Sequence, residues 1–217
     1  MPAFILTKDQ VYSLKKDGAD ISIVTVGLAW DPVEGCNELD LDVMAILDTG
    51  KKQGAVPLGK DMIYFHKRVS DDHAIELCED NRSGNGAGDD ELLWCNLSLV
   101  PQDVPSVHIW ITIFGGKQKE QTFGQIKSAT CKLYTGKVEQ ISTTPCCPVN
   151  ERPEQLAEFN MKGGDSAARS IHVATFYRFQ GGWRFQTVER AIPTAETFCE
   201  TEYAGLKLEG VNRVPVA

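Results

Sequence analysis

No apolar run in this sequence approaches the roughly 20 residues that a membrane-spanning helix requires. The N-terminal residues also lack the basic segment and long apolar run of a signal peptide. Basic residues are scarce, with 22 Lys and Arg against 30 Asp and Glu, a net charge of −8 and no basic cluster. Because the phosphate backbone of nucleic acids favours a basic surface, direct nucleic-acid binding is not expected. We predict a cytoplasmic protein without a transmembrane segment.

Familiar catalytic and zinc-binding motifs are missing as well. The sequence has no HExxH, GxSxG or Walker lysine motif. Its seven cysteines form no CxxC pair, so a structural zinc site is not expected, and without an export signal the thiols should be reduced. The adjacent Cys146 and Cys147 could bind a soft metal, but two ordinary thiols in a loop is the favoured interpretation.

The chain is rich in short apolar and β-branched segments that are separated by turn residues. The predicted strands are residues 21–30, 39–47, 61–69, 74–78, 92–100, 107–114, 129–134, 171–180 and 183–192. The last two are joined by Gly181-Gly182, a two-residue hairpin signal, and 107–114 is expected at the centre of a sheet. About nine strands at this spacing predict a mainly β fold, an antiparallel β-sandwich with short helical appendages.

One β-sandwich domain is expected over residues 1–192. Prolines and the Gly163-Gly164 pair mark residues 144–168 as an excursion from that domain, with a short helix at 154–159. Residues 193–217 form a C-terminal tail, in which a second short helix is expected near 195–203.

The most distinctive stretch is residues 79–91, where five carboxylates and two carboxamides accompany a single cation, Arg82. Gly84, Gly86 and Gly88 permit positive φ and a tight curl that aims oxygen atoms at one point. Because strands are predicted on both sides, the loop cannot easily spread its charges apart. A hard cation that takes six to eight oxygens, calcium above all, is the expected ligand. A solvated acidic turn is the alternative.

Two other loop motifs share features with this stretch. In an EF-hand loop starting at Asp80, Glu91 would fall at position 12, but Arg82 would occupy position 3 and Asn85 the glycine position. The EF-hand is therefore rejected. A phosphate-binding loop would need a metal between the phosphate and the five acids, and that bridged arrangement stays open.

A second acidic pattern lies in the predicted strand 39–47. Its period of two places Leu39, Leu41 and Val43 on one face and Asp40 and Asp42 on the other. Aspartate is disfavoured in strands, so a pair on one face needs a reason. Two carboxylates about 7 Å apart could flank a cation. A solvated edge strand is the alternative.

Several motifs, taken in order, resemble the TerD family of tellurite-resistance and stress-response proteins. They are Gly27–Asp31, Leu39–Asp42, Glu79–Gly84, Gly86–Glu91, Gln121–Gln125 and Phe176–Phe185. The resemblance spans residues near 5 to 190. It implies a β-sandwich that binds two calcium ions through the acidic loop and the Asp-x-Asp strand. It also implies a cytosolic, non-enzymatic role in resistance to tellurite, phage or other chemical stress, with partners among other stress-response proteins, including membrane-associated complexes.

The resemblance also implies the calcium ligands, carried over motif by motif. They are Asp31, Asp40, Asp42, Asp80, Asn81, Asp89, Asp90 and Glu91, with backbone carbonyls of the glycine loop completing the shells. Asn85 stands where the family usually has an acid. It adds a neutral candidate oxygen, so the site nearest the middle of the loop is expected to be the weaker one.

A metal-dependent phosphoryl or nucleotide hydrolase that uses the same carboxylates is the alternative function. A hydrolase needs a positioned base, and His66, His73, His108 and His172 have no partners nearby in sequence. His108 is expected to be a strand-face histidine. A thiol-based sequestrant of metals or oxyanions is a third class, supported by the cysteine count alone. We predict a calcium-binding module that acts through interactions and is not an enzyme.

Overall fold

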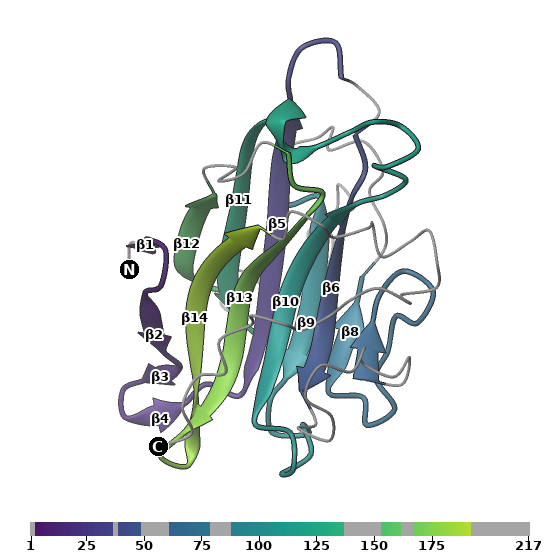
Figure 1. Cartoon of the computed structure of the whole chain (residues 1–217). Helices are drawn as coiled ribbons and strands as arrows, with labels where there is room; N and C mark the ends of the chain where they lie inside the picture. The colour runs from purple at the N-terminus through teal and green to yellow at the C-terminus, as the bar shows by residue number, and fades with distance from the viewer. Residues whose placement is uncertain are drawn as a thin grey trace, which may run out of the picture.

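Two six-stranded sheets packed face to face form a β-sandwich (Figure 1). The computed structural model describes residues 3–36, 39–48, 61–78, 88–136, 153–161 and 167–191. In the first sheet the strand order is β1-β12-β11-β5-β9-β8, and in the second it is β2-β14-β13-β10-β6-β7. The predicted antiparallel sandwich is confirmed, with one parallel pair, β1 and β12.

The first sheet consists of β1 (Phe4–Leu6), β12 (Gln155–Met161), β11 (Ile126–Thr135), β5 (Ile23–Pro32), β9 (Glu91–Asn96) and β8 (Ile75–Leu77). The second consists of β2 (Val11–Ser13), β14 (Gly182–Ala191), β13 (Ser170–Phe179), β10 (Ser106–Ile113), β6 (Leu41–Asp48) and β7 (Met62–Ile63). A small hairpin, β3 (Lys15–Lys16) and β4 (Ala19–Asp20), lies with β1 and β2 along one side of the sandwich (Figure 1).

The core lies between the two sheets and is filled by alternate residues of the long strands. Val24, Val26 and Leu28 of β5 meet odd-numbered residues of β6 and β10, such as Val43 and Ile109. All residues of β6 and β10 are buried, including those that face away from the core. Asp40 and Asp42 are both buried, so the solvated-edge alternative for this pair is wrong. The central position predicted for 107–114 is confirmed by β10.

The helix predicted at 154–159 is wrong, because residues 155–159 belong to strand β12. The segment pairs with β11 on one side and with β1 on the other. Leu156, Phe159 and Met161 enter the core, and this burial outweighs local helix propensity. Residues 144–152 and 162–166 of the predicted excursion, and the predicted tail helix, lie outside the described residues.

The one complete helical turn within the described ranges is the 3-10 turn η2 (Phe123–Gln125). No helix there is long and apolar enough to cross a bilayer. The strand predicted at 61–69 is shorter than expected, since only Met62–Ile63 pair with β6. Tyr64 and Lys67 then bridge each other in a local turn.

The β13–β14 hairpin is confirmed, but its turn is Gln180-Gly181 and not Gly181-Gly182. Gln180 has φ of 48° and Gly181 has φ of 77°, as a two-residue turn of the mirror-image type requires. Gly182 instead opens β14 opposite Phe179. A Cβ atom at Gly182 would lie 3.1 Å from an oxygen of Asp20, which explains why a glycine fits there.

Gln180→Asn is expected to raise the free energy of unfolding by about 0.5 kcal/mol, since asparagine tolerates the positive φ of this turn better than glutamine does. Urea denaturation measures the change. Gln186→Asn, which places the same substitution within β14, is the control and should lower stability. A loss of stability in Gln180→Asn would contradict the expectation.

Candidate metal centre

Six of the nine predicted site residues lie within the described ranges, and Asp80, Asn81 and Asn85 lie outside them. Asp89, Asp90 and Glu91 follow one another at the start of β9, directly after Gly88. Asp31 is the last residue but one of β5, while Asp40 and Asp42 lie just before and within β6. The described candidates therefore come from both sheets.

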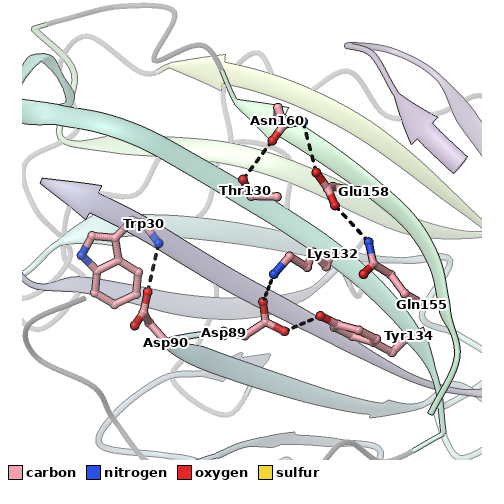
Figure 2. Close-up of polar contacts among 9 residues, drawn as sticks. All are labelled: Trp30, Asp89, Asp90, Thr130, Lys132, Tyr134, Gln155, Glu158 and Asn160. Carbon is pink, nitrogen blue, oxygen red and sulfur yellow. Dashed lines mark hydrogen bonds and ion pairs between the residues drawn. The ribbon is translucent and has the colours of Figure 1, made fainter. Parts of the chain in front are cut away.

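Asp89 lies on the outer face of the first sheet, where two residues of β11 bind its carboxylate (Figure 2). Lys132 Nζ donates to Oδ1 at 2.7 Å, and Tyr134 Oη donates to Oδ2 at 2.5 Å. Gly27 makes this position accessible, because a Cβ atom there would lie 2.5 Å from Asp89 Oδ2. Burial raises the pKa of Tyr134 and the hydrogen bond to Asp89 raises it further, so the phenol stays a donor.

Asp90 extends the hydrogen bonding between β9 and β5 beyond the last paired residues, Leu28 and Glu91. Its amide donates to Leu28 O at 2.7 Å, and its Oδ2 accepts from the amide of Trp30 at 3.0 Å (Figure 2). Burial raises the pKa of the Asp90 carboxyl. The Asp89 and Asp31 carboxylates raise it further, against the Trp30 amide and Lys132. The surroundings of Asp90 thus disfavour its negative charge.

Glu91 points between the two sheets, on the same face of β9 as the core residues Leu93 and Cys95. Its side chain is 2% exposed, and its Oε2 accepts from the amide of Val43 on β6 at 2.5 Å. β7 pairs with Ala45 and Ile46 and does not reach Val43. The Glu91 carboxylate therefore binds a main-chain amide of β6 that has no partner in β7. The three successive acids therefore contact β11, β5 and β6.

The other three candidates are arranged differently. Asp31 is exposed, and its Oδ2 accepts from Ser128 Oγ at 2.7 Å. Asp40 is buried, and its carbonyl accepts from the amide of Phe114. Asp42 is 3% exposed and lies opposite Thr112, on the face of β6 away from the core, as the alternation predicted.

The described residues do not by themselves form a metal centre: no three of their His, Cys, Asp or Glu side chains are grouped to hold an ion. Asp31 and Asp90 lie near enough for one charge to affect the other. Asp89 and Glu91 already bind hydrogen-bond donors. Lys132 and Tyr134 were not identified from the sequence. Lys132 and Tyr134 are two residues apart in a predicted strand, so the sequence shows that they share a face of that strand. Nothing in the sequence indicates that Asp89 lies beside this face.

A second polar cluster is buried on the outer face of the second sheet. His108 and His172 are each 2% exposed, and Thr175 Oγ1 lies 3.2 Å from His108 Nδ1 and 3.0 Å from His172 Nε2. His108 Nε2 lies 3.8 Å from Asp48 Oδ2 and 3.3 Å from Ser106 Oγ. His108 is a strand-face histidine, as predicted, and its burial separates this cluster from solvent.

Comparison with known proteins gives consistent matches over most of the chain. A family model described as the TerD domain matches residues 3–195. Tellurium resistance protein TerD of Serratia marcescens is 29% identical over 187 residues, which cover 84% of this chain and 88% of that protein. General stress protein 16U of Bacillus subtilis is 29% identical over 185 residues, with the same coverage of 84% and 88%.

A solved structure shows the same fold. The crystal structure of a homologue of the telluride resistance protein TerD, from Streptomyces coelicolor, matches with a TM-score of 0.60 and 20% identity. The match covers 86% of this chain and 99% of that chain. At this identity the likeness is evidence for the fold alone.

Proposed function

Since the chain belongs to the TerD family, which includes tellurium-resistance and general stress proteins, we propose that it is a cytoplasmic calcium-binding protein. It acts in the response to tellurite or chemical stress by contacts with other stress-response proteins, including membrane-associated complexes, and not by catalysis. The observation that carries the calcium proposal is the environment of Asp90. A buried carboxylate near two others, at the end of an acidic glycine-rich stretch, is stabilised by a bound cation.

The donor chemistry of this region fits calcium in part. Asp31 and Asp90 offer carboxylate oxygens, which a hard cation prefers. Asp89 and Glu91 fit less well, since their carboxylates already accept hydrogen bonds from Tyr134, Lys132 and Val43. We propose that Asp31 and Asp90 hold one of two ions with oxygens of the 79–88 segment, Asp80 and Asn81 among them. Asn85 would serve the weaker site, and Asp40 and Asp42 are the other candidate carboxylates.

The proposal of a non-catalytic role is supported by the second polar cluster. A general base must reach its substrate within hydrogen-bonding distance. His108 lies near Asp48 but is 2% exposed, so bulk substrate does not reach the pair.

Calcium at 100 times its dissociation constant is expected to add about 2.7 kcal/mol to the free energy of unfolding of the wild-type protein. Asp90→Asn should abolish most of this gain and yet be more stable than wild type in chelator at pH 7. The raised pKa of Asp90 means that the folded protein favours a neutral carboxyl group at this position, so stability is lost as pH rises through the folded pKa. Asparagine is neutral at every pH and avoids this loss. Thermal melts in chelator and in millimolar calcium measure both effects.

Asp17→Asn is the matched control. Asp17 is exposed in the β3–β4 turn at φ of 51°, a conformation that asparagine tolerates, and it lies outside the acidic region. Its response to calcium should equal that of wild type. Identical melting midpoints of the wild-type protein in chelator and in calcium would contradict the proposed function.

A further inference from the structure

Asp89 is the first residue after the glycine-rich stretch whose side chain is fixed on both carboxylate oxygens. Its neighbour Gly88 has φ of 119°, a conformation open to glycine, and strand pairing of β9 begins only at Glu91. Lys132 and Tyr134 bind Asp89 from β11, and its side chain is 9% exposed. The bonds of Asp89 therefore fix the chain between Gly88, whose positive φ few other residues adopt, and the paired strand.

Fixing Asp89 also directs Asp90. Asp89 and Asp90 are joined by one peptide bond, so holding the Asp89 side chain against β11 restricts the main chain that carries the Asp90 carboxylate. Asp90 accepts a hydrogen bond from the amide of Trp30 (Figure 2). The Asp31 carboxylate is near enough for its charge to affect Asp90. The absence of a side chain at Gly27 leaves the space in which Asp89 sits, so three strand residues, Gly27, Lys132 and Tyr134, define the position of Asp89.

We propose that Tyr134 and Lys132 are positioning residues of the cation site: by binding both oxygens of Asp89, they hold the main chain so that Asp90 presents its carboxylate to calcium. Asp89 is in this view an anchor and not itself a ligand. This inference rests on the proposed calcium function and deepens it by separating anchoring acids from coordinating ones.

In the competing interpretation Asp89 coordinates calcium directly. That interpretation predicts the opposite change in calcium affinity when the Tyr134 hydroxyl is removed. If Asp89 were a ligand, the Tyr134 hydroxyl would compete with calcium for its oxygen, and removing the hydroxyl would strengthen binding. If Asp89 is an anchor, removing the hydroxyl loosens the chain and weakens binding. Tyr134 is the better residue to test because Lys132 carries a positive charge near Asp90, and its loss would favour a cation in either case.

The experiment is calorimetric titration of the full chain with calcium chloride. Tyr134→Phe should weaken binding by about fivefold, the factor that corresponds to one hydrogen bond of ordinary strength. Thr130→Val is the matched control, since Thr130 is on the same strand and face, and its hydroxyl donates to Asn160 at 2.9 Å and not to Asp89 (Figure 2). It should bind calcium as wild type does.

A second pair of variants separates positioning from a general structural effect. In an Asp89→Ala background the phenol has no carboxylate to hold, so adding Tyr134→Phe should cause no further loss of affinity. Unchanged or tighter binding by Tyr134→Phe overturns the inference, and so does a further loss in the Asp89→Ala background. Absence of calcium binding by the wild-type protein overturns the proposed function and the inference together.

Discussion

Replacing Arg178 by alanine is expected to lower the free energy of unfolding by about 3 kcal/mol, because the guanidinium group donates to three main-chain carbonyls. Nη2 lies 2.8 Å from Val100 O and 3.2 Å from Pro101 O, and Nε lies 3.1 Å from Val104 O. These carbonyls belong to the connection that leads from β9 in the first sheet to β10 in the second. Arg178 therefore fixes a crossing between the sheets.

Two further contacts make Arg178 part of the fold and not a surface charge. Its Cζ lies 4.4 Å from the ring centroid of Trp183, its partner across the β13–β14 hairpin, and its amide donates to Pro105 O. Burial lowers the pKa of Arg178, in keeping with a guanidinium group partly removed from water. Loss of the side chain would leave three partly buried carbonyls without this donor, which is the costly part of such a change.

Urea denaturation of Arg178→Ala, Arg178→Lys and Arg184→Ala tests this expectation. Arg184 is the matched control on the same hairpin. Its guanidinium carbon lies 5.2 Å from the ring of Phe179, and its Nη1 makes one long contact of 3.4 Å to Trp183 O. Its loss should cost less than about 1 kcal/mol. Lysine cannot reproduce the planar fork of donors, so Arg178→Lys should recover less than half of the loss. Equal losses in the two alanine variants would contradict the assigned role.

Strands with a regular period of two, or with a clear turn signal, could be predicted from the sequence. β5, β6, β10 and the β13–β14 hairpin fall where alternation, β-branched residues and glycines indicated them. These signals are local, since each depends on the pattern of residues within a window of about ten positions. The one-residue error in the hairpin turn arose because Gly182 satisfies a distant requirement, the approach of Asp20.

Strands stabilised by remote partners could not be predicted in this way. β12 carries Gln155, Glu158 and Asn160 among its apolar residues and resembles an amphipathic helix when considered alone. It is a strand because β1 and β11 flank it on both sides. The short strands β1 to β4 lack enough residues to show a period and were missed for that reason.

The candidate site shows the same division between local and remote information. The sequence identified the acids from their density and spacing, but it could not show which of them are already bonded within the fold. The partners of Asp89, Lys132 and Tyr134, lie 43 and 45 positions further along the chain. Three of the predicted ligands, Asp80, Asn81 and Asn85, lie outside the described residues, and their role stays a prediction.

Acidification below about pH 6.5 is expected to destabilise the protein through His172. The ring of His172 stacks on Trp110, with centroids 4.8 Å apart, and meets His108 edge to face at 5.1 Å. Its Nε2 lies 3.1 Å from Ala174 O, so that nitrogen carries the proton and Nδ1 bears the lone pair. Nδ1 is buried without a hydrogen-bond partner among the described residues. A second proton there would therefore add an uncompensated charge.

The direction in which stability changes with pH follows from the direction of the pKa shift of His172. Burial lowers the pKa of His172 well below its ordinary value of 6.5, and His108 and Arg190 lower it further, against the contact with Ala174 O. Between the folded and unfolded pKa values the unfolded chain binds more protons, so stability rises with pH. The contribution of neutral His172 is complete above pH 6.5 and is lost as pH falls toward the folded pKa. Each pH unit in that window costs about 1.36 kcal/mol.

Urea denaturation between pH 7.5 and pH 5 measures this slope, a range in which most carboxylates remain ionised. The comparison is between the slopes of variants and not their absolute stabilities, since His172→Phe also removes the hydrogen bond to Ala174 O. His172→Phe should flatten the dependence, because the unfolded variant has one fewer group to protonate. His73→Gln, at an exposed turn position, is the matched control and should keep the wild-type slope. A slope in His172→Phe as steep as in wild type would assign the acid sensitivity to other groups.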